Sequence, residues 1–348
     1  MLQHVFDTSG LPRQMKSSGI RSTADLARML GLSRWTVSRA LNGHQDIAPA
    51  TADRIRAEAA RLGFAPSLLG RSLRSGRTDL VGVCVPDLED YFLTNKVSLI
   101  QRHLAKSGFH VLLQIAESAE EEAAAIRRFA SMQCSGWVTM ASRLEGDNTL
   151  AGLDSDLPVV HVDPLYPKSG AVAKTDRSRA MRLAVRHLHA RGCRRLVTAG
   201  IDPGGTGYAA ERMSGLGAEI RCWRWEKPAH FLESAGADDF ETGALAAAEL
   251  LALPGRGRTG VIALNDRVAF SMAQSLASAE VRIPARVALV GYDDSGLART
   301  TRPALTSIDP HPGKLIQAAA ALLLKALVGK PQQERIIIRP SLIPRESS

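Results

Sequence analysis

Apolar residues between positions 22 and 63 recur every three to four residues, which is the spacing of short amphipathic helices. Ser22 or Thr23 can cap the first helix, and Asp25 follows Ser22 at the spacing of a capping box. This pattern predicts a helix that ends before Gly31. Its apolar face consists of Ala24, Leu26, Ala27 and Leu30.

A second helix is predicted directly after Gly31, a residue that tolerates the positive φ of a tight turn. Ser33 can cap this helix. Its inward positions are Val37, Ala40 and Leu41, and its outward positions are Arg34, Trp35, Thr36, Ser38 and Arg39. Two helices joined by a short turn predict a helix-turn-helix.

The outward face of the second helix carries side chains that can read DNA. A recognition helix meets base edges through its N-terminal residues, where an arginine can bond bidentately to guanine. The alternative is an ordinary helical hairpin. Trp35 counts against it, because a large ring between two arginines is normally buried unless a thymine methyl or a sugar covers it.

From residue 79 onward, short apolar runs alternate with amphipathic stretches, which predicts parallel sheets covered by helices. The fold class predicted here is α/β, with two doubly wound lobes and a ligand cleft at the carboxyl ends of their strands. The expected strands are 80–85, 111–115, 137–141, 159–162, 171–174, 196–199, 219–223, 261–264, 287–290 and 334–339. The expected helices lie near 95–107, 119–132, 178–191, 241–252 and 267–279.

Charge is distributed unevenly along the 348 residues. Residues 1–78 contain 12 Lys or Arg against 5 Asp or Glu, whereas the remainder contains 32 against 30. Positive charge concentrated beside the helix-turn-helix favours phosphate neutralisation. The length itself predicts two or three compact units.

Other bulk features bear on compartment and cofactors. Cys84, Cys134, Cys193 and Cys222 lie far apart and show no metal-ligand spacing, so we expect reduced thiols, no metal and no cofactor. No apolar run approaches the ~18 residues that span a bilayer, and the first residues lack a signal-peptide core. We therefore expect a cytoplasmic protein.

The run from Thr23 to Asn42, with its Leu-Ser-x-x-Thr-Val-Ser-Arg-Ala-Leu-Asn core, resembles the DNA-binding headpiece of the lactose and galactose repressor (LacI-type) family. A third helix after Pro49, ended by Gly63, would complete the three-helix headpiece of that family; its stripe is Ala52, Ile55, Ala59 and Leu62. The resemblance implies DNA contacts from Ser33, Arg34, Trp35, Thr36, Ser38, Arg39 and Asn42.

The resemblance also covers the rest of the chain, where the family's effector domain looks like a periplasmic sugar-binding protein whose chain crosses between two lobes three times. It implies a headpiece over 22–65, a hinge linker over 66–78 and an effector-binding and dimerisation domain over 79–348. Lobe 1 would take about 79–188 and 309–336, and lobe 2 about 189–308 and 337–348. Residues 1–21 have no periodicity and predict a disordered arm, and a further hypothesis is that translation starts at Met15.

In the family, the segment matching the hinge linker folds into a short helix on operator DNA and inserts a leucine into the minor groove. Leu73 holds that position here, and Arg71 beside it can reach phosphate. Ser67 replaces the usual Asn, and Gly70 replaces the usual Ala, which costs a helix up to ~1 kcal/mol. We expect this hinge to order less readily without DNA.

Polar residues at strand ends indicate the small-molecule site. Asn265 with Asp266, and Asp293 with Asp294, each follow a predicted strand and can hydrogen-bond to hydroxyl groups. For Asp266 and Asp294, capping of the next helix is the expected role. The resemblance implies effector contacts for Phe92, Asp176, Arg212, Asn265 and Asp293. For Phe92, the alternative is a core ring.

Arg212 departs from the family's pattern. Only six residues separate it from the strand expected at 219, so the helix that normally follows this arginine would be shortened. This part of the site would then be rebuilt for an unusual effector or bind nothing.

Two other classes of protein compete with this interpretation. A two-lobed enzyme could use residues 200–207 as a phosphate loop, although the run fits neither the dinucleotide fingerprint nor the P-loop, and no histidine shows a catalytic spacing. A plain binding protein could carry a vestigial headpiece. We predict instead a regulator without enzymatic activity, a repressor that binds a near-palindromic operator as a homodimer under the control of a sugar-like or nucleoside-like effector.

Overall fold

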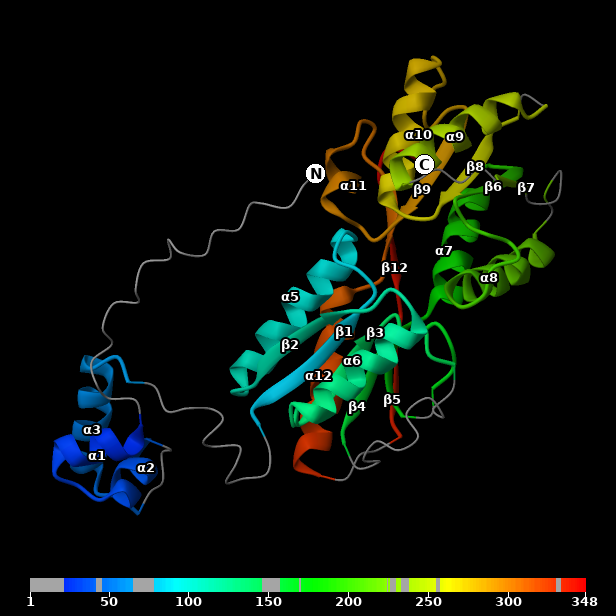
Figure 1. Ribbon diagram of the computed structural model, residues 1–348. Coiled ribbons are helices and arrows are strands. Elements are labelled where there is room, and N and C mark those ends of the chain that lie inside the picture. Colours follow the sequence, from blue (N-terminus) through cyan, green and yellow to red (C-terminus); the bar gives the residue numbers. More distant parts are fainter. Residues whose placement is uncertain are drawn as a thin grey trace, which may run out of the picture. The chain divides into compact units, whose positions relative to one another are not determined.

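The computed structural model describes residues 22–41, 46–64, 78–145, 157–168, 170–223, 225, 230–232, 238–254, 257–329 and 333–348. It divides into two compact units, Met1–Thr78 and Asp79–Ser348 (Figure 1). Within these described ranges, no helix combines the length and the apolar character needed to cross a bilayer. The four cysteines, all of which lie in these ranges, are free thiols.

The described residues of the first unit form three helices, α1 (Thr23–Leu30), α2 (Arg34–Leu41) and α3 (Pro49–Arg61). The Ser22 hydroxyl accepts a hydrogen bond from the Asp25 amide (3.2 Å) at the start of α1, and Gly31 ends that helix at φ +65°. The three predicted helices are confirmed. Their shared core is Leu26, Ala27, Val37, Ala40, Ile47, Ala52, Ile55 and Ala59.

Lobe 1 of the second unit is a six-stranded parallel sheet in the order β11-β5-β4-β3-β1-β2. Its strands are β1 (Leu80–Val85), β2 (His110–Ile115), β3 (Gly136–Met140), β4 (Val159–Val162), β5 (Ala171–Thr175) and β11 (Arg335–Ile338). One face of the sheet packs against α5 (Tyr91–Lys106) and α12 (Pro312–Val328), and the other face packs against α6 (Ala119–Ser131).

Lobe 2 is a second six-stranded sheet in the order β12-β10-β9-β8-β6-β7, parallel except for β12. Its strands are β6 (Arg195–Ala199), β7 (His230–Leu232), β8 (Thr259–Ala263), β9 (Val287–Tyr292), β10 (Thr306–Asp309) and β12 (Ser341–Ile343). Helices α7 (Arg177–Ala190) and α8 (Tyr208–Cys222) cover one face, and α9 (Asp239–Ala252) and α10 (Asp266–Ser278) cover the other. A short helix, α11 (Gly296–Thr300), follows β9. The predicted pair of doubly wound lobes is confirmed.

The chain passes between the lobes after β5, after β10 and after β11. The first passage lies earlier than predicted. The resemblance places residues up to 188 in lobe 1, but Met181, Val185 and Leu188 of α7 pack in the core of lobe 2. The sequence shows that α7 has an apolar face, but it does not show which of the two sheets this face covers.

The strand predicted over 219–223 is wrong, because α8 continues through Cys222. Side chains hold this last turn in place: the Glu219 carboxylate accepts hydrogen bonds from Arg186 Nε (2.8 Å) and Trp223 Nε1 (2.9 Å). The strand next to β6 is instead β7, which begins at residue 230. A short apolar run does not distinguish a strand from a helix by its period, and here the run belonged to a helix.

The residues after β11 are part of lobe 2, where the resemblance placed 337–348. Strand β12 pairs antiparallel with β10. The Ser347 carbonyl then accepts a hydrogen bond from the Leu289 amide (2.8 Å), and the Ser348 hydroxyl lies 2.7 Å from His187 Nε2. Residues 341–348 therefore close one edge of the lobe 2 sheet.

Candidate functional site

The outward face of α2 presents the side chains that the sequence predicted for DNA. Trp35 is 60% exposed, and Arg34 beside it is also exposed. The guanidinium of Arg39 lies over the Trp35 ring, 4.9 Å from the centroid, and its Nε is 2.5 Å from Asp46 Oδ2. Arg39 is thus held over the indole, so that Trp35 and Arg39 form one surface.

The start of α2 is fixed by the hydroxyl groups of Ser33 and Thr36. The Thr36 amide donates to Ser33 Oγ (2.9 Å), and the two hydroxyl oxygens lie 2.8 Å apart. Ser33 therefore caps the helix as predicted. Because both residues lie at the N-terminus of α2, this capping also sets where Arg34 and Trp35 point.

Three residues predicted to touch DNA, Asn42, Arg71 and Leu73, lie outside the described residues. So do Ser67 and Gly70, the two departures from the family's hinge sequence. The predicted arm over 1–21 lies outside them too, and only Thr78 of the predicted linker is described. The expectations for these residues therefore stay predictions.

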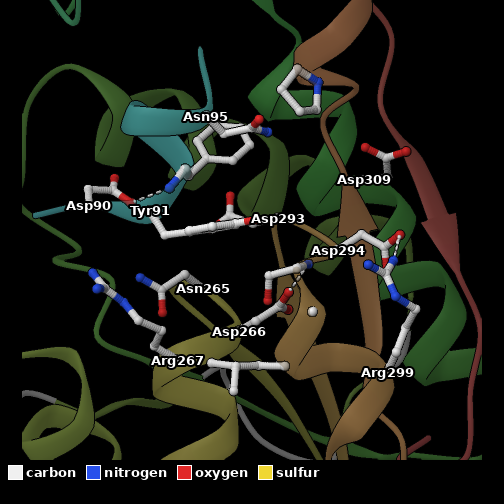
Figure 2. Close-up of a pocket in the computed structure, with 15 residues that line it drawn as sticks. Asp90, Tyr91, Asn95, Asn265, Asp266, Arg267, Asp293, Asp294, Arg299 and Asp309 are labelled. Atoms are coloured by element: carbon white, nitrogen blue, oxygen red, sulfur yellow. Dashed lines mark hydrogen bonds and ion pairs between the residues drawn. The ribbon is translucent and has the colours of Figure 1, made fainter. Parts of the chain in front are cut away.

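A cavity of about 540 Å³ lies between the lobes of the second unit, at the carboxyl ends of their strands. Phe92, Asn265 and Asp293, three of the five predicted effector contacts, line it. Figure 2 shows Tyr91 and Asn95 from α5 on one side and Asn265 and Arg267 from the start of α10 on the other. The remaining lining residues are Asp90, Asp266, Asp294, Ser295, Gly296, Leu297, Arg299, Asp309 and Pro312.

Asn265 combines two roles in this cavity. Its Oδ1 accepts a hydrogen bond from the Val268 amide (2.9 Å) and caps α10, while its Nδ2 donates to Asp239 Oδ2 (2.8 Å). The same Asp239 carboxylate pairs with Arg267 (2.5 Å). The amide is therefore fixed at the cavity wall, with its orientation set from both ends.

The helix-capping roles predicted for Asp266 and Asp294 are wrong. Buried Asp266 accepts hydrogen bonds from the Ser307 hydroxyl (2.6 Å) and the Ser295 amide (2.7 Å), and burial raises its pKa. Asp294 pairs with Arg345 (2.5 Å), on the segment after β12. Both carboxylates therefore join parts of the chain that are distant in sequence, and a local pattern does not show these contacts.

Asp293 follows β9 in a left-handed backbone conformation, with φ +99°. Among the described residues, its carboxyl group has no hydrogen-bond or ion-pair partner. Loss of hydration raises its pKa to about 8, and the nearby Asp266 adds to this shift while Arg212 opposes it. A partly protonated carboxyl group at the cavity wall can both donate and accept hydrogen bonds.

The structure corrects the prediction for Arg212. It lies inside α8, a helix of 15 residues, so the shortened helix inferred from the sequence does not exist. Its guanidinium is buried over the Tyr292 ring, 4.3 Å from the centroid, and donates to the Leu264 carbonyl (2.7 Å). Arg212 supports the strand ends behind the cavity and is absent from its lining.

Asp176 also lies apart from the other predicted contacts. It caps α7, with its carboxylate accepting a hydrogen bond from the Arg179 amide (2.8 Å). It lines a separate cavity of about 470 Å³ together with Lys174, Arg177, Ser178 and Glu211. The structure thus brings three of the five predicted contacts together and leaves Asp176 and Arg212 outside that group.

A buried ion cluster that the sequence analysis missed connects the two lobes. Asp163, after β4, pairs with Lys96 of α5 (2.8 Å) and with Arg177 of α7 (3.1 Å). Tyr208 of α8 donates its hydroxyl to the Asp163 carbonyl. Burial alone would raise the pKa of Asp163, but Arg177 and Lys96 outweigh it and hold the pKa well below its usual range.

A simple signal could have found Asp163 and the missed cavity residue Asp90. Both follow a predicted strand, as Asn265 and Asp293 do. Applying the strand-end rule to every strand would have included them. Tyr91, which is 67% exposed at the start of α5, carries no such signal.

The loop considered as a phosphate cradle folds onto itself. Asp202 accepts a hydrogen bond from the Gly204 amide through its carboxylate (2.8 Å) and from the Gly205 amide through its carbonyl (3.3 Å). Two of the amides that a phosphate would need are therefore already used.

Comparison with known families matches both units. Residues 23–67 match the family of bacterial regulatory proteins described as the lacI family. Residues 185–348 match the family described as periplasmic binding protein-like domain.

Curated relatives align over nearly the whole chain. The HTH-type transcriptional repressor PurR of Vibrio atlanticus is 24% identical over 329 residues, covering 93% of this chain and 97% of the relative. The HTH-type transcriptional regulator GalR of Escherichia coli is 28% identical, covering 93% and 94% respectively. These relatives are transcription regulators, not enzymes.

Solved structures show the same architecture. The lac repressor dimer bound to operator and the anti-inducer ONPF superposes with a TM-score of 0.79 at 21% identity, covering 93% of this chain and 97% of the other. The complex of the transcriptional regulator CelR with cellobiose superposes with a TM-score of 0.66 at 25% identity, covering 94% and 100%. The fold is therefore a helix-turn-helix headpiece followed by a periplasmic-binding-protein-like domain.

Proposed function

The chain belongs to the lacI family of bacterial regulatory proteins, and we propose that it is a cytoplasmic repressor that binds a near-palindromic operator as a homodimer. It is a DNA-binding regulator with an effector-binding domain.

The DNA contacts proposed here start from the exposed face of α2. Arg34 and Trp35 stand at the helix N-terminus, the end that meets base edges in helix-turn-helix proteins. Arg39, held over Trp35, extends this surface by one turn. Ser33, Thr36 and Ser38 would contact phosphate or base edges, and Asn42, Arg71 and Leu73 would continue the contact toward the minor groove.

The effector proposed here is a small polyhydroxylated molecule in the 540 Å³ cavity. The observation that carries this proposal is the convergence of Phe92, Asn265 and Asp293 from three separate elements onto one cavity between the lobes. Hydroxyl groups suit the amide and carboxyl groups, and an aromatic ring suits the apolar face of a sugar. A nucleoside-like effector is the second candidate, favoured by the aromatic residues alone.

Control of DNA binding would pass through the angle between the lobes. The cavity and the Lys96–Asp163–Arg177 cluster both join residues of the two lobes, so a ligand that favours one lobe angle shifts the population toward it. The shift in operator affinity is limited by the ligand's preference for that angle.

A homodimer fits both the headpiece and the second unit. Two headpieces related by a twofold axis match two half-sites of a near-palindromic operator. The second unit also exposes apolar side chains that a partner copy could cover, including Ile115 and Phe240.

Selection of duplexes from a random pool by the purified full chain tests this function. We expect enrichment of a site with twofold symmetry, bound more weakly as salt rises because counterions are released from DNA. Arg34→Ala should lose the enriched motif. Arg61→Ala is the matched control, because it removes one positive charge from the end of α3 and leaves α2 intact. Enrichment of an asymmetric motif, or of none, would contradict the proposal.

A further inference from the structure

Among the described residues that line the effector cavity, acidic side chains outnumber basic ones. Five carboxyl groups and two guanidinium groups line it: Asp90, Asp266, Asp293, Asp294 and Asp309 against Arg267 and Arg299. Both guanidinium groups already have carboxylate partners, since Arg267 pairs with Asp239 (2.5 Å) and Arg299 lies 3.7 Å from Asp294. Neither of these two guanidinium groups is therefore left without a carboxylate partner for an anionic ligand.

Four of these carboxyl groups have protein partners that fix their positions. Asp90 accepts a hydrogen bond from the Phe92 amide (2.8 Å), and Asp309 pairs with His311 (2.7 Å). Asp266 and Asp294 are held by the serines and the arginine described above. In the described part of the chain, Asp293 alone among the five has no such partner. It is the group left to meet a ligand.

Aromatic rings stand beside these carboxyl groups. Phe92 lines the cavity, and Lys96 lies over its ring at 4.4 Å from the centroid. Tyr91, also in the lining, is mostly exposed. Because Lys96 already lies over the Phe92 ring, the exposed Tyr91 ring is the aromatic face that suits a cation or the apolar face of a sugar.

Building on the proposed effector function, we propose that the effector of this cavity is a cationic polyol, such as an amine-bearing sugar, and that anionic ligands such as sugar phosphates are excluded. The ammonium group would pair with Asp293, and the hydroxyl groups would bond to Asn265 and Asn95. A phosphate in the same place would face the carboxyl groups without a free guanidinium to balance it.

Proton release is a measurable consequence of this pairing. The raised pKa of Asp293, about 8, means that its carboxyl group is mostly protonated at neutral pH in the free protein. A bound ammonium favours the ionised form, so binding releases a proton. At pH values below that pKa, the affinity should therefore increase roughly tenfold for each unit by which the pH rises. The charged groups that act on Asp293 are Asp266 of α10, Arg212 of α8, and Asp90 and Lys96 at or in α5.

Calorimetry on the full chain with matched sugars tests the proposal. The probes are glucosamine, glucose, N-acetylglucosamine and glucose 6-phosphate, and the corresponding galactose series, at pH 6 and pH 7 in buffers of different ionisation enthalpy. We expect one amine-bearing sugar to bind at least about tenfold more tightly than its neutral and N-acetylated counterparts, since an ammonium-carboxylate pair outweighs a neutral hydrogen bond. The sugar phosphate should bind most weakly.

The variant Asp293→Asn should remove both the preference for the amine and the change of affinity with pH. Glu120→Gln, an exposed carboxylate at the start of α6, is the matched control and should keep both. If Asp293→Asn does not fold, the number of protons released by the unaltered chain, obtained from the buffer dependence of the enthalpy, still decides the question.

Equal or tighter binding by a neutral sugar or a sugar phosphate would overturn the cationic effector, as would failure of every amine-bearing sugar to bind. The proposed function is judged separately. A neutral sugar that binds this cavity and changes operator affinity would leave that function standing, whereas absence of operator selection would remove it whatever the cavity binds.

Discussion

Trp35 is a residue whose exposure demands an explanation. Among the described residues, its ring is not part of the headpiece core, which is made by residues such as Leu26, Val37 and Ile55. The guanidinium of Arg39 lies over the ring. A large apolar ring left in water costs free energy that burial against DNA would recover. The structure thus supports the use of Trp35 as a contact surface.

Trp35→Ala should weaken binding to the selected operator by about 1–3 kcal/mol and affect binding to random DNA much less, because base contacts carry the sequence preference. The thermal stability of the headpiece should stay nearly unchanged, since the side chain is 60% exposed. Fluorescence anisotropy with labelled operator and scrambled duplexes measures the difference.

Met29→Ala is the control for this prediction, because Met29 is an exposed apolar side chain on α1 instead of α2. It should leave operator affinity unaltered. Equal losses on operator and scrambled DNA for Trp35→Ala would show that the indole does not take part in base recognition.

At the scale of elements, the packing of α7 against α8 depends on Gly215. A Cβ atom placed there would lie 2.1 Å from the Ser178 carbonyl oxygen of α7, so the two helices could not keep their distance. Two residues along α8, a Cβ at Gly217 would meet only the end of the Arg221 side chain, at 3.5 Å. The same helix therefore contains one glycine required by packing and one that is not.

Gly215→Ala should destabilise the second unit by about 1–3 kcal/mol, the usual cost of overpacking a close contact. Gly217→Ala, the matched control, should stabilise it slightly, by up to ~1 kcal/mol, because alanine favours helix over glycine. Scanning calorimetry of both variants measures the contrast. Equal melting temperatures for the two variants would mean that α7 and α8 do not approach as closely as the structure shows.

For the molecule as a whole, the charges of Asp163, Lys96 and Arg177 hold residues from different lobes together. A buried ion pair adds little net stability over an apolar replacement, but removing one partner leaves the other charges buried without compensation. Asp163→Asn would leave the positive charges of Lys96 and Arg177 buried without the Asp163 carboxylate to balance them. The cluster thus couples the stability of each lobe to their association.

Asp163→Asn should lower the free energy of unfolding of the second unit by about 3–5 kcal/mol. Because the pKa of Asp163 is lowered in the folded state, this contribution is complete at neutral pH and is lost as the pH falls below the ordinary value of an aspartate. Urea unfolding at neutral and at acidic pH should therefore show a difference between the two proteins that shrinks in acid.

Glu334→Gln is the control for the ion cluster. Its partner Lys325 lies 2.7 Å away in an exposed pair, and such pairs contribute only ~0–1 kcal/mol. A loss for Asp163→Asn no larger than that for Glu334→Gln would show that the cluster does not hold the lobes together.

The sequence by itself determined the local features of this protein. The capped helices of the headpiece, the outward placement of Arg34 and Trp35, and the alternation of strands and helices all follow from short-range periodicity and capping, which depend on neighbours in the chain. The rule that polar residues gather at strand ends also led to Asn265 and Asp293, because the ends of parallel strands share one edge of a sheet.

Tertiary structure decided what depends on distant partners. It assigned α7 to lobe 2, extended α8 through residues 219–222, and placed Arg212 behind the cavity instead of in it. It also showed that Asp266 and Asp294 bind residues 29 to 51 positions away. Such contacts form only when separate elements pack together, and no local pattern in the chain encodes which elements these are.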